Sequence, residues 1–343
     1  MILRKGKADE NVLDRSVRKR LGHSLSQQKG MGVSSDPVTL RTRHVGMLAV
    51  TAAANDLAAQ GIRPDCVRTD ILLPPGTEES ALRGIEDEIR ETSLRADMTV
   101  TGGHTEVTSA VSRPIVIAHA AGTKSLLCGS RSEPLPGDAA DTAGAAESEG
   151  DRPAEADGRP GLPAPGDSIL AIGRIGLEGT FLLAQERSEE LERRFSARFV
   201  RRAQQAGEHL LILPSVQAMS ELGVCPAHLV NVSEGGIYAA IWRLSTETGW
   251  GFEVSLPDIP ILQETIEITN YYDINPYQME SAGCVLAVIP TGRTGICEQM
   301  EGRGFVTRII GSLTEGRDKV IAIGEERQSL NRPAADALIP ILG

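Results

Sequence analysis

The stretch GMLAVTAAANDLAAQG at residues 46–61 is the clearest structural pattern in this sequence. It is rich in Ala and Leu, which favour helices, and Gly61 is well placed to end the helix, with Pro64 beyond it. Asn55 and Asp56 fall in its last turns. There the helix dipole disfavours a carboxylate, and only alanines precede it by one turn. Asp56 is therefore a ligand of Mg²⁺ held between protein and phosphate oxygens, or else it is a solvated acid or caps a neighbouring loop.

Helices and strands alternate along the rest of the chain. Before residue 129, strands are predicted at 66–73, 98–101 and 114–121, and a helix at 78–95 with Thr77 as its N-cap. After residue 167, strands are predicted at 168–173, 252–256, 284–289 and 306–310, and helices at 177–186, 196–205, 235–248, 264–272 and 295–303. Such interleaving is typical of layered domains, so the predicted fold class is α/β (α+β layered).

Residues 129–166 differ in composition from everything around them. They hold eight acids, three arginines, six prolines and seven glycines, with almost no large apolar residue. Burial of so few apolar groups cannot offset the entropy lost on ordering, so we expect a disordered, dispensable insert. An ordered lid is the alternative. The predicted organisation is a domain at 1–128, an insert at 129–167 and a second domain at 168–343.

Composition and charge exclude several classes of protein. The net charge of the 343 residues is −11, and no Lys/Arg run is interleaved with aromatics, which argues against a nucleic-acid partner. No apolar run reaches the ~18 residues of a membrane span. The five cysteines form no CxxC pair, so neither a disulfide framework nor a zinc site is expected. Free thiols suit a reducing compartment, and we expect a cytoplasmic protein.

Two glycine-rich segments are candidates for binding a phosphate. The first, TGGHTE at 101–106, follows the short strand predicted at 98–101, so Gly102 and Gly103 should form a turn whose amides approach a ligand. The second, NVSEGG at 231–236, precedes a helix, where open amides and the helix dipole favour an anion. An ordinary tight turn and simple capping by Ser233 are the respective alternatives.

Other catalytic patterns are absent from the sequence. The second glycine segment has no following Lys, as a Walker A loop would, and no GxGxxG, GxSxG or HExxH motif occurs. His119 lies inside an apolar predicted strand and is expected to be a core histidine. His104 is the one histidine next to a candidate site.

Taken together and in order, the motifs SSDP (34–37), NDLA (55–58), GGHTEV (102–107) and SEGG (233–236) resemble the PurM-like superfamily. This group includes aminoimidazole ribonucleotide synthetase, the hydrogenase maturation factor HypE, thiamine-monophosphate kinase and selenophosphate synthetase. The sequence is most similar to the AIR synthase-related proteins. The resemblance implies an N-terminal domain that dimerises through its sheet and a C-terminal α/β domain that covers the cleft.

The resemblance also implies ATP and Mg²⁺ as cofactors and transfer of the γ-phosphate to a carbonyl- or amide-type oxygen of a small substrate. By motif, Asp36 and Asp56 would be the Mg²⁺ ligands, and Asn55 would orient the phosphates or the neighbouring loop. The remaining nucleotide-binding positions implied by the match are Gly102, Gly103, His104, Glu106, Asn231, Ser233, Glu234, Gly235 and Gly236.

The sequence departs from the family pattern at three places. The acidic GDDAA-type segment expected shortly before Asp36 is replaced by GHSLSQQKGMGV at 22–33. Asn231 stands where relatives carry Asp. The chain ends without the C-terminal cysteine of HypE. Two hypotheses follow: an ATP- and Mg²⁺-dependent phosphoryl-transfer enzyme, or a degenerate PurM-like protein that binds a nucleotide or a partner without turnover.

Overall fold

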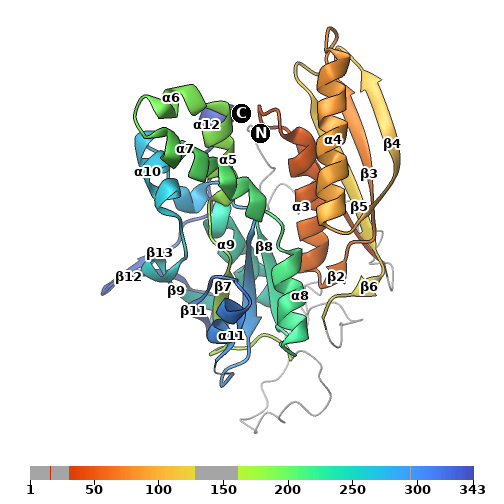
Figure 1. Ribbon diagram of the computed structural model, residues 1–343. Helices are drawn as coiled ribbons and strands as arrows, with labels where there is room; N and C mark the ends of the chain where they lie inside the picture. The colour runs from red at the N-terminus through yellow and green to blue at the C-terminus, as the bar shows by residue number, and fades with distance from the viewer. Residues whose placement is uncertain (1–15, 17–30, 128–160, 294) are drawn as a thin grey trace.

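The computed structural model of this protein describes residues 31–127, 161–293 and 295–343, together with residue 16. The described part is built on two β-sheets with helices packed on them (Figure 1). Strands of the first sheet lie between residues 32 and 122, and those of the second between 168 and 329. The predicted layered mixture of helices and sheets is therefore confirmed.

The first sheet has the strand order β1–β5–β3–β4. Its strands and helices, in chain order, are β1 (Gly32–Val38), α3 (Val45–Ala59), β3 (Cys66–Leu73), α4 (Glu79–Arg95), β4 (Thr99–Val107) and β5 (Ile115–Gly122). The short strands β2 (Ile62–Arg63) and β6 (Lys124–Ser125) pair with each other. β3 and β4 run parallel, and the other neighbours antiparallel. α3 packs against β1, β5 and α4, so helices cover one face of this sheet.

Small residues let α3 pack this closely. The run Ala52–Ala54 lies in its middle, and Ala53 and Ala54 are fully buried. Gly46 lies where α3 crosses α4, and a Cβ there would come within 2.5 Å of the Ile85 carbonyl oxygen. A helix lined with Ala and Gly can approach both a sheet and another helix, which explains why most of α3 is buried.

The second sheet has the order β13–β12–β9–β11–β7–β10–β8. Its strands are β7 (Ser168–Ile172), β8 (His228–Val232), β9 (Gly251–Ser255), β10 (Cys284–Ile289), β11 (Thr307–Thr314), β12 (Lys319–Ile323) and β13 (Glu326–Ser329). The accompanying α-helices are α5 (Leu177–Glu186), α6 (Ser188–Glu192), α7 (Ala197–Gln205), α8 (Leu213–Glu221), α9 (Gly236–Thr248), α10 (Gln263–Tyr271), α11 (Ile296–Gly302) and α12 (Ile339–Leu342). Three 3₁₀ turns are η4 (Ala206–His209), η5 (Leu256–Asp258) and η6 (Pro276–Gln278).

Strand directions gather several loops at one end of the second sheet. β7, β8 and β9 all run in the same direction, because each is antiparallel to the strand that separates it from the next. The segments that leave these three strands therefore meet at one end, as do those that enter β10 and β11. Residues that are far apart in the sequence therefore lie close together at this end of the sheet.

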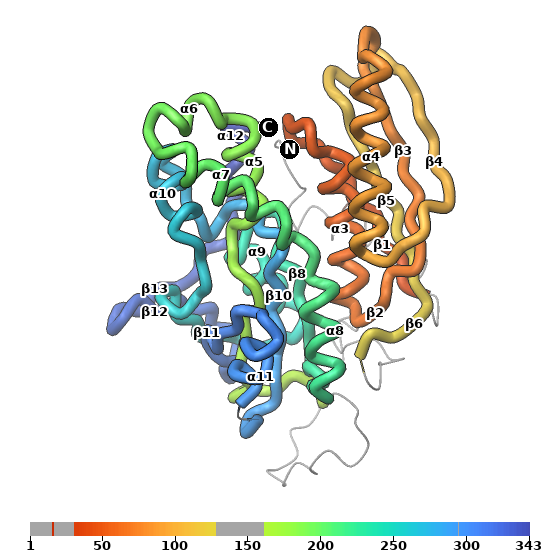
Figure 2. The backbone as a smooth tube through the Cα atoms, viewed as in Figure 1, coloured from red at the N-terminus to blue at the C-terminus, as the bar shows by residue number. Residues whose placement is uncertain are grey.

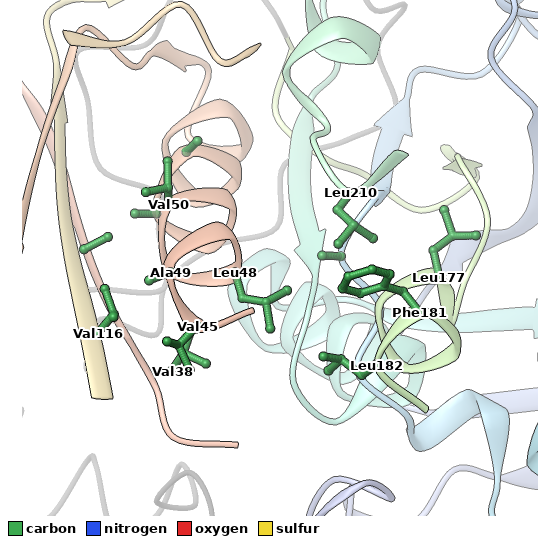
Figure 3. Close-up of a cluster of buried hydrophobic side chains, with 14 of the residues drawn as sticks. Val38, Val45, Leu48, Ala49, Val50, Val116, Leu177, Phe181, Leu182 and Leu210 are labelled. Atoms are coloured by element: carbon green, nitrogen blue, oxygen red, sulfur yellow. The ribbon is translucent and has the colours of Figure 1, made fainter. Parts of the chain in front are cut away.

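One hydrophobic core joins the two halves of the molecule. Val45 and Leu48 of α3 belong to the same buried cluster as Leu177 and Phe181 of α5. Figure 3 shows Leu48 pointing from α3 toward Phe181, across the boundary between the halves. The tube in Figure 2 shows α3 lying between the first sheet and the second half of the chain. Side chains placed at this junction are thus held by a shared core.

The most informative error of the sequence prediction concerns Gly102 and Gly103. They were expected to form a turn after a strand at 98–101, but they lie in the middle of β4. The pairing of β4 with β3 shifts register between Val67 and Arg68, which is a β-bulge, and Gly102 there has φ +133°. A glycine pair can bend a strand without ending it, and the sequence alone does not separate the two cases.

Smaller corrections concern Thr77, His119 and the insert. The N-cap of α4 is Glu78, and the Thr77 hydroxyl instead donates to the Pro74 carbonyl oxygen. The His119 side chain is 42% exposed, because it points to the open face of the first sheet. Residues 129–160 of the predicted insert lie outside the described residues. Its end is ordered against the second sheet, where the Trp250 indole donates to the Pro163 carbonyl oxygen at 2.9 Å.

Candidate functional site

Asp56 lies near the end of α3, at the junction between the two halves of the molecule. One carboxylate oxygen accepts a hydrogen bond from the Asn231 amide at 3.0 Å, and the other is 3.4 Å from the Ser34 hydroxyl. Ser34 is on β1, and Asn231 is on β8 of the second sheet. Asp56 therefore connects three elements that are far apart in the sequence.

Asp36 faces the same junction from β1. It lies two residues after Ser34, so both side chains are on the same side of the strand, the side on which α3 packs. Its charge contributes to raising the pKa of Glu178 and of Glu280 in the second half of the molecule. Asp36 and Asp56, the two carboxylates predicted to bind Mg²⁺, are thus brought to one place.

Asn231 has a buried oxygen atom without a partner. The residue is 3% exposed, and its amide nitrogen is used by Asp56. Within the described residues, no group donates a hydrogen bond to its Oδ1. Buried polar atoms are nearly always satisfied, so this oxygen calls for a ligand or a water. Carboxylate and amide oxygens are the ligands that Mg²⁺ prefers, so the residues present fit this ion.

The loop 233–236 turns sharply into α9 through two glycines. Gly235 and Gly236 have φ values of +78° and +63°, and a Cβ on Gly236 would lie 2.6 Å from the Tyr277 carbonyl oxygen. These amides were expected to be open to an anion. Instead the Gly235 N–H donates to the Asp336 carboxylate at 2.7 Å, and the Gly236 N–H donates to the Ser233 carbonyl oxygen. The Asp336 carboxylate therefore occupies the position at which an anionic ligand was predicted.

Three carboxylates that sequence reasoning missed surround this loop. Burial, reinforced by Asp336 and Asp36, raises the pKa of Glu178 to about 8. Burial and the charge of Glu178 also raise the pKa of Glu280, and burial raises that of Asp336 to about 6. Mutual repulsion among carboxylates in a desolvated place favours their protonated forms.

Backbone contacts hold these three acids in position. The Glu178 carboxylate accepts from the Ala282 N–H at 3.1 Å, and the Gly179 N–H donates to the Glu280 carbonyl oxygen. Asp336 also accepts from the Leu338 N–H at 2.8 Å. One signal for Glu178 was available in the sequence: an acid in the first turn of an otherwise apolar helix, GLEGTFLLA. The position of Asp336 depends on how the C-terminal segment folds back, and no local pattern indicates it.

Asn55 connects the two halves of the molecule. It is fully buried, its amide nitrogen donates to the Leu210 carbonyl oxygen at 2.8 Å, and its amide oxygen accepts from the Ile212 N–H at 2.9 Å. Both ends of the side chain are therefore engaged with the segment before α8. Of the two roles expected for Asn55, this geometry favours orienting a neighbouring loop.

The GGHTE segment lies apart from these residues. Gly102, Gly103, His104 and Glu106 are on β4, at the opposite edge of the first sheet from β1. The His104 and Glu106 side chains are largely exposed and 3.5 Å apart. A single chain thus unites Asp36, Asp56, Asn231 and the 233–236 loop but does not bring the β4 residues to them.

Comparison with protein families agrees with this two-part architecture. The AIR synthase related protein N-terminal domain matches residues 21–123, and the AIR synthase related protein C-terminal domain matches residues 164–324. Together the two matches cover most of the chain. The chain belongs to the PurM/HypE-like superfamily. Its two domains correspond to the two sheets described above, and the PurM-like two-domain fold expected from the sequence is confirmed.

Relatives within this superfamily are distant in sequence and similar in fold. A putative hydrogenase expression/formation protein of Methanocaldococcus jannaschii is 21% identical over 311 residues, which span 90% of this chain and 82% of that protein. The crystal structure of the hydrogenase maturation protein HypE in complex with ATP has a TM-score of 0.66 at 16% identity, with 96% of each chain covered. Thiamine monophosphate kinase of Aquifex aeolicus, complexed with AMPPCP and TMP, has a TM-score of 0.59 at 15% identity, covering 88% of this chain and 86% of that one.

In the part of the chain that the structure describes, no helix is long and apolar enough to cross a membrane. No group of three or more His, Cys, Asp or Glu side chains in the same residues is arranged to hold a metal ion. Cys66, Cys225, Cys284 and Cys297 are free thiols. Cys128 lies outside the described residues.

Proposed function

We propose that this protein binds Mg-ATP at the junction of its two domains and transfers the γ-phosphoryl group to a carbonyl- or amide-type oxygen of a small substrate. The observation that carries the proposal is the contact between Asp56 and Asn231 across the junction, with Asp36 beside it and an unpartnered Asn231 oxygen. ATP binding by a HypE of this fold and AMPPCP binding by a kinase of this fold support it.

Asp36 and Asp56 would hold the Mg²⁺ ion, and the Asn231 oxygen could complete the protein's share of its ligands. The ion would neutralise charge on the triphosphate, and the protein would position the acceptor oxygen in line with the γ-phosphorus. The γ-phosphoryl group would pass to the acceptor oxygen and leave ADP. That oxygen would then be able to depart as phosphate.

We further propose a homodimer through the open face of the first sheet. Helices cover one face of this sheet, whereas Val33 on the other is 60% exposed. Val100 and Val107 of the edge strand β4 are 42% and 62% exposed. A second copy packed here would bury this apolar surface. It would also offer its own β4, with Gly102–Glu106, to a site that one chain leaves incomplete.

A second candidate function is binding without turnover. It is favoured by the Asp336 carboxylate, which already takes the Gly235 N–H, and by the acids Glu178 and Glu280 around the same loop. Negative charge there opposes a triphosphate unless Mg²⁺ or protonation offsets it. In this case the protein would bind a nucleotide or a partner without catalysing phosphoryl transfer.

Two measurements distinguish these candidates. Calorimetric titration with Mg-ATP tests binding, and an assay of ADP release with amide- and carbonyl-containing compounds tests turnover. ADP release that rises with one compound and is lost in Asp56→Asn supports the enzyme. Mg-ATP binding with no ADP release above the rate in buffer supports the second candidate. We also propose a cytoplasmic location, in keeping with the free thiols.

A further inference from the structure

A cavity of about 380 Å³ lies at the same end of the second sheet, where β7, β9 and β11 meet. Segment 257–261, which follows β9, forms one wall, and Val306 and Arg308 at the start of β11 form another. Arg174, which follows β7, lines the cavity between them. Its volume is in the range of small-molecule pockets, ~300–1,000 Å³.

Arg174 is fixed in place by its neighbours in the chain. The Gly173 N–H donates to the Val306 carbonyl oxygen at 2.8 Å, and the Ile175 N–H donates to the Pro260 carbonyl oxygen at 2.9 Å. Ile175 also forms a parallel bridge with Ile261. The residues on both sides of Arg174 are thus bonded to the two walls of the cavity, so the backbone at Arg174 is held in place without a ligand.

The guanidinium of Arg174 has no partner in the described part of the chain. Among residues 31–127, 161–293 and 295–343, no hydrogen bond, ion pair or ring contact involves it, although the residue is partly buried in a protein of net charge −11. A guanidinium carries five N–H donors in a fork that matches carboxylate and phosphate oxygens. A partly desolvated cation without an anion is unfavourable, which suggests that the anion comes from a ligand.

Arg308 adds a second positive group to the same cavity. Its Nη1 atom pairs with the Glu301 carboxylate and donates to the Thr307 carbonyl oxygen. The Nε and Nη2 donors remain for another acceptor. Asp258, also lining the cavity, likewise has no partner among the described residues. The cavity thus presents donors for an oxyanion and, separately, an acceptor for a donor group.

We propose that this cavity binds the oxyanion, a phosphate or a carboxylate, of a small molecule that also carries a hydrogen-bond donor. Arg174 binds the oxyanion with help from Arg308, and Asp258 accepts from a hydroxyl, amine or amide of the same molecule. Apolar side chains such as Ile259, Ile261 and Val306 frame the cavity. The inference depends on the second domain alone and does not rest on the proposed function.

The test follows the Nε–H resonance of Arg174 by NMR in the full-length protein. The resonance is assigned by its absence from the spectrum of Arg174→Lys. Inorganic phosphate and succinate are titrated in turn at constant ionic strength, which tells the two oxyanions apart. We expect a saturable shift of this resonance with at least one of them. No shift with either, up to about 20 mM, would overturn the proposal, since even millimolar affinity would be visible.

Matched variants separate a ligand site from a structural role. Asp258→Asn should bind the same simple oxyanion at least as tightly as the wild type, because a nearby negative charge is lost. Arg174→Gln should weaken binding by about tenfold or more in calorimetry, whereas Arg198→Gln on α7 should leave it unchanged. In the absence of ligand, Arg174→Gln should melt at the wild-type temperature and bind Mg-ATP normally. A marked fall in that melting temperature would show that the guanidinium stabilises the fold and would contradict the proposal.

Discussion

The carboxylate of Asp336 accepts a hydrogen bond of 2.7 Å from the backbone N–H of Gly235, at the start of α9. Asp336 belongs to the C-terminal segment, whereas the Gly235 amide was expected from the sequence to meet a phosphate. The C-terminal segment therefore places an acid in a position suited to an anionic ligand.

The hydrogen bond between Asp336 and Gly235 predicts that Asp336→Ala lowers the stability of the fold but strengthens nucleotide binding. Loss of two charge-assisted hydrogen bonds, to Gly235 and Leu338, should lower the free energy of unfolding by about 1–3 kcal/mol. Mg-ATP should bind more tightly, because an amide is freed and a negative charge removed. Chemical denaturation and calorimetry measure the two effects, with the exposed Asp318→Ala as control. Weaker nucleotide binding in Asp336→Ala would show that Asp336 supports nucleotide binding rather than occupying a position that the nucleotide needs.

Glu178 predicts how stability varies with pH. Its pKa in the folded protein is about 8, above its usual 4.5. The folded state therefore binds this proton more tightly than the unfolded state, and the resulting stabilisation is lost as the pH rises from about 5 to 8. Glu178→Gln keeps an oxygen for the Ala282 N–H but cannot ionise. The variant should match the wild type near pH 5 and exceed it in stability at pH 8.

Urea denaturation across this pH range, without Mg²⁺ or nucleotide, measures the effect. Glu280 and Asp336 also have raised pKa values, so the pH dependence of the variant should be reduced rather than abolished. Parallel stability curves for the two proteins would mean that Glu178 is ionised throughout this range.

The open face of the first sheet predicts that Val33→Glu disrupts a dimer. Val33 is 60% exposed on β1, so the substitution should leave the fold intact and place a charge in the subunit contact. Light scattering should give about twice the 36.6 kDa chain mass for the wild type and one chain mass for the variant. Leu94→Glu is a matched control, because Leu94 is 67% exposed on α4 and should not affect assembly. A monomeric wild type at micromolar concentration would exclude the dimer.

The segment rich in acids and prolines should be replaceable, but only as far as residue 160. Exchanging 129–160 for a short Gly/Ser linker should leave the melting temperature nearly unchanged, because its composition offers no apolar core. Extending the replacement through 166 should lower that temperature. It removes the partner of the Trp250 indole and the hydrogen bond from the Gly166 N–H to Leu313. Equal melting temperatures for the two variants would mean that these contacts add little to stability.

Sequence reasoning recovered the elements whose patterns are local. The Ala-rich helix around Asn55, the strand at 66–73 and the apolar strand at 284–289 lie where they were predicted, because each carries its own periodicity or propensity. β1 was not predicted as a strand. Its sequence GVSSDPV has three consecutive polar residues, without the alternation expected of a strand, and contains Pro37, which an edge strand tolerates.

The candidate site could be predicted only in part, because some of its contacts join residues that are far apart in the sequence. Asp36, Asp56 and Asn231 were identified by motif, and the structure brings them together. Asn231 contacts Asp56 across a sequence separation of 175 residues, and Asp336 contacts Gly235 across 101 residues. Both contacts depend on how the domains and the C-terminal segment pack. No local pattern encodes such pairings. Gly102 and Gly103 of β4 show that a local pattern can also be ambiguous, because the same two residues suit a turn or a bulge.

Calorimetric titration of Mg-ATP into the wild type, Asp56→Asn and Asn231→Asp shows whether Asp36, Asp56 and Asn231 form a site for Mg-ATP, with folding checked by thermal melts. We expect binding to the wild type, and binding weakened by about 1–3 kcal/mol in Asp56→Asn, which loses an anionic ligand. We expect tighter binding in Asn231→Asp, which gains an anionic ligand. Equal affinity of the wild type and Asp56→Asn, or no binding to the wild type at millimolar Mg-ATP, would contradict a Mg-ATP site at these residues.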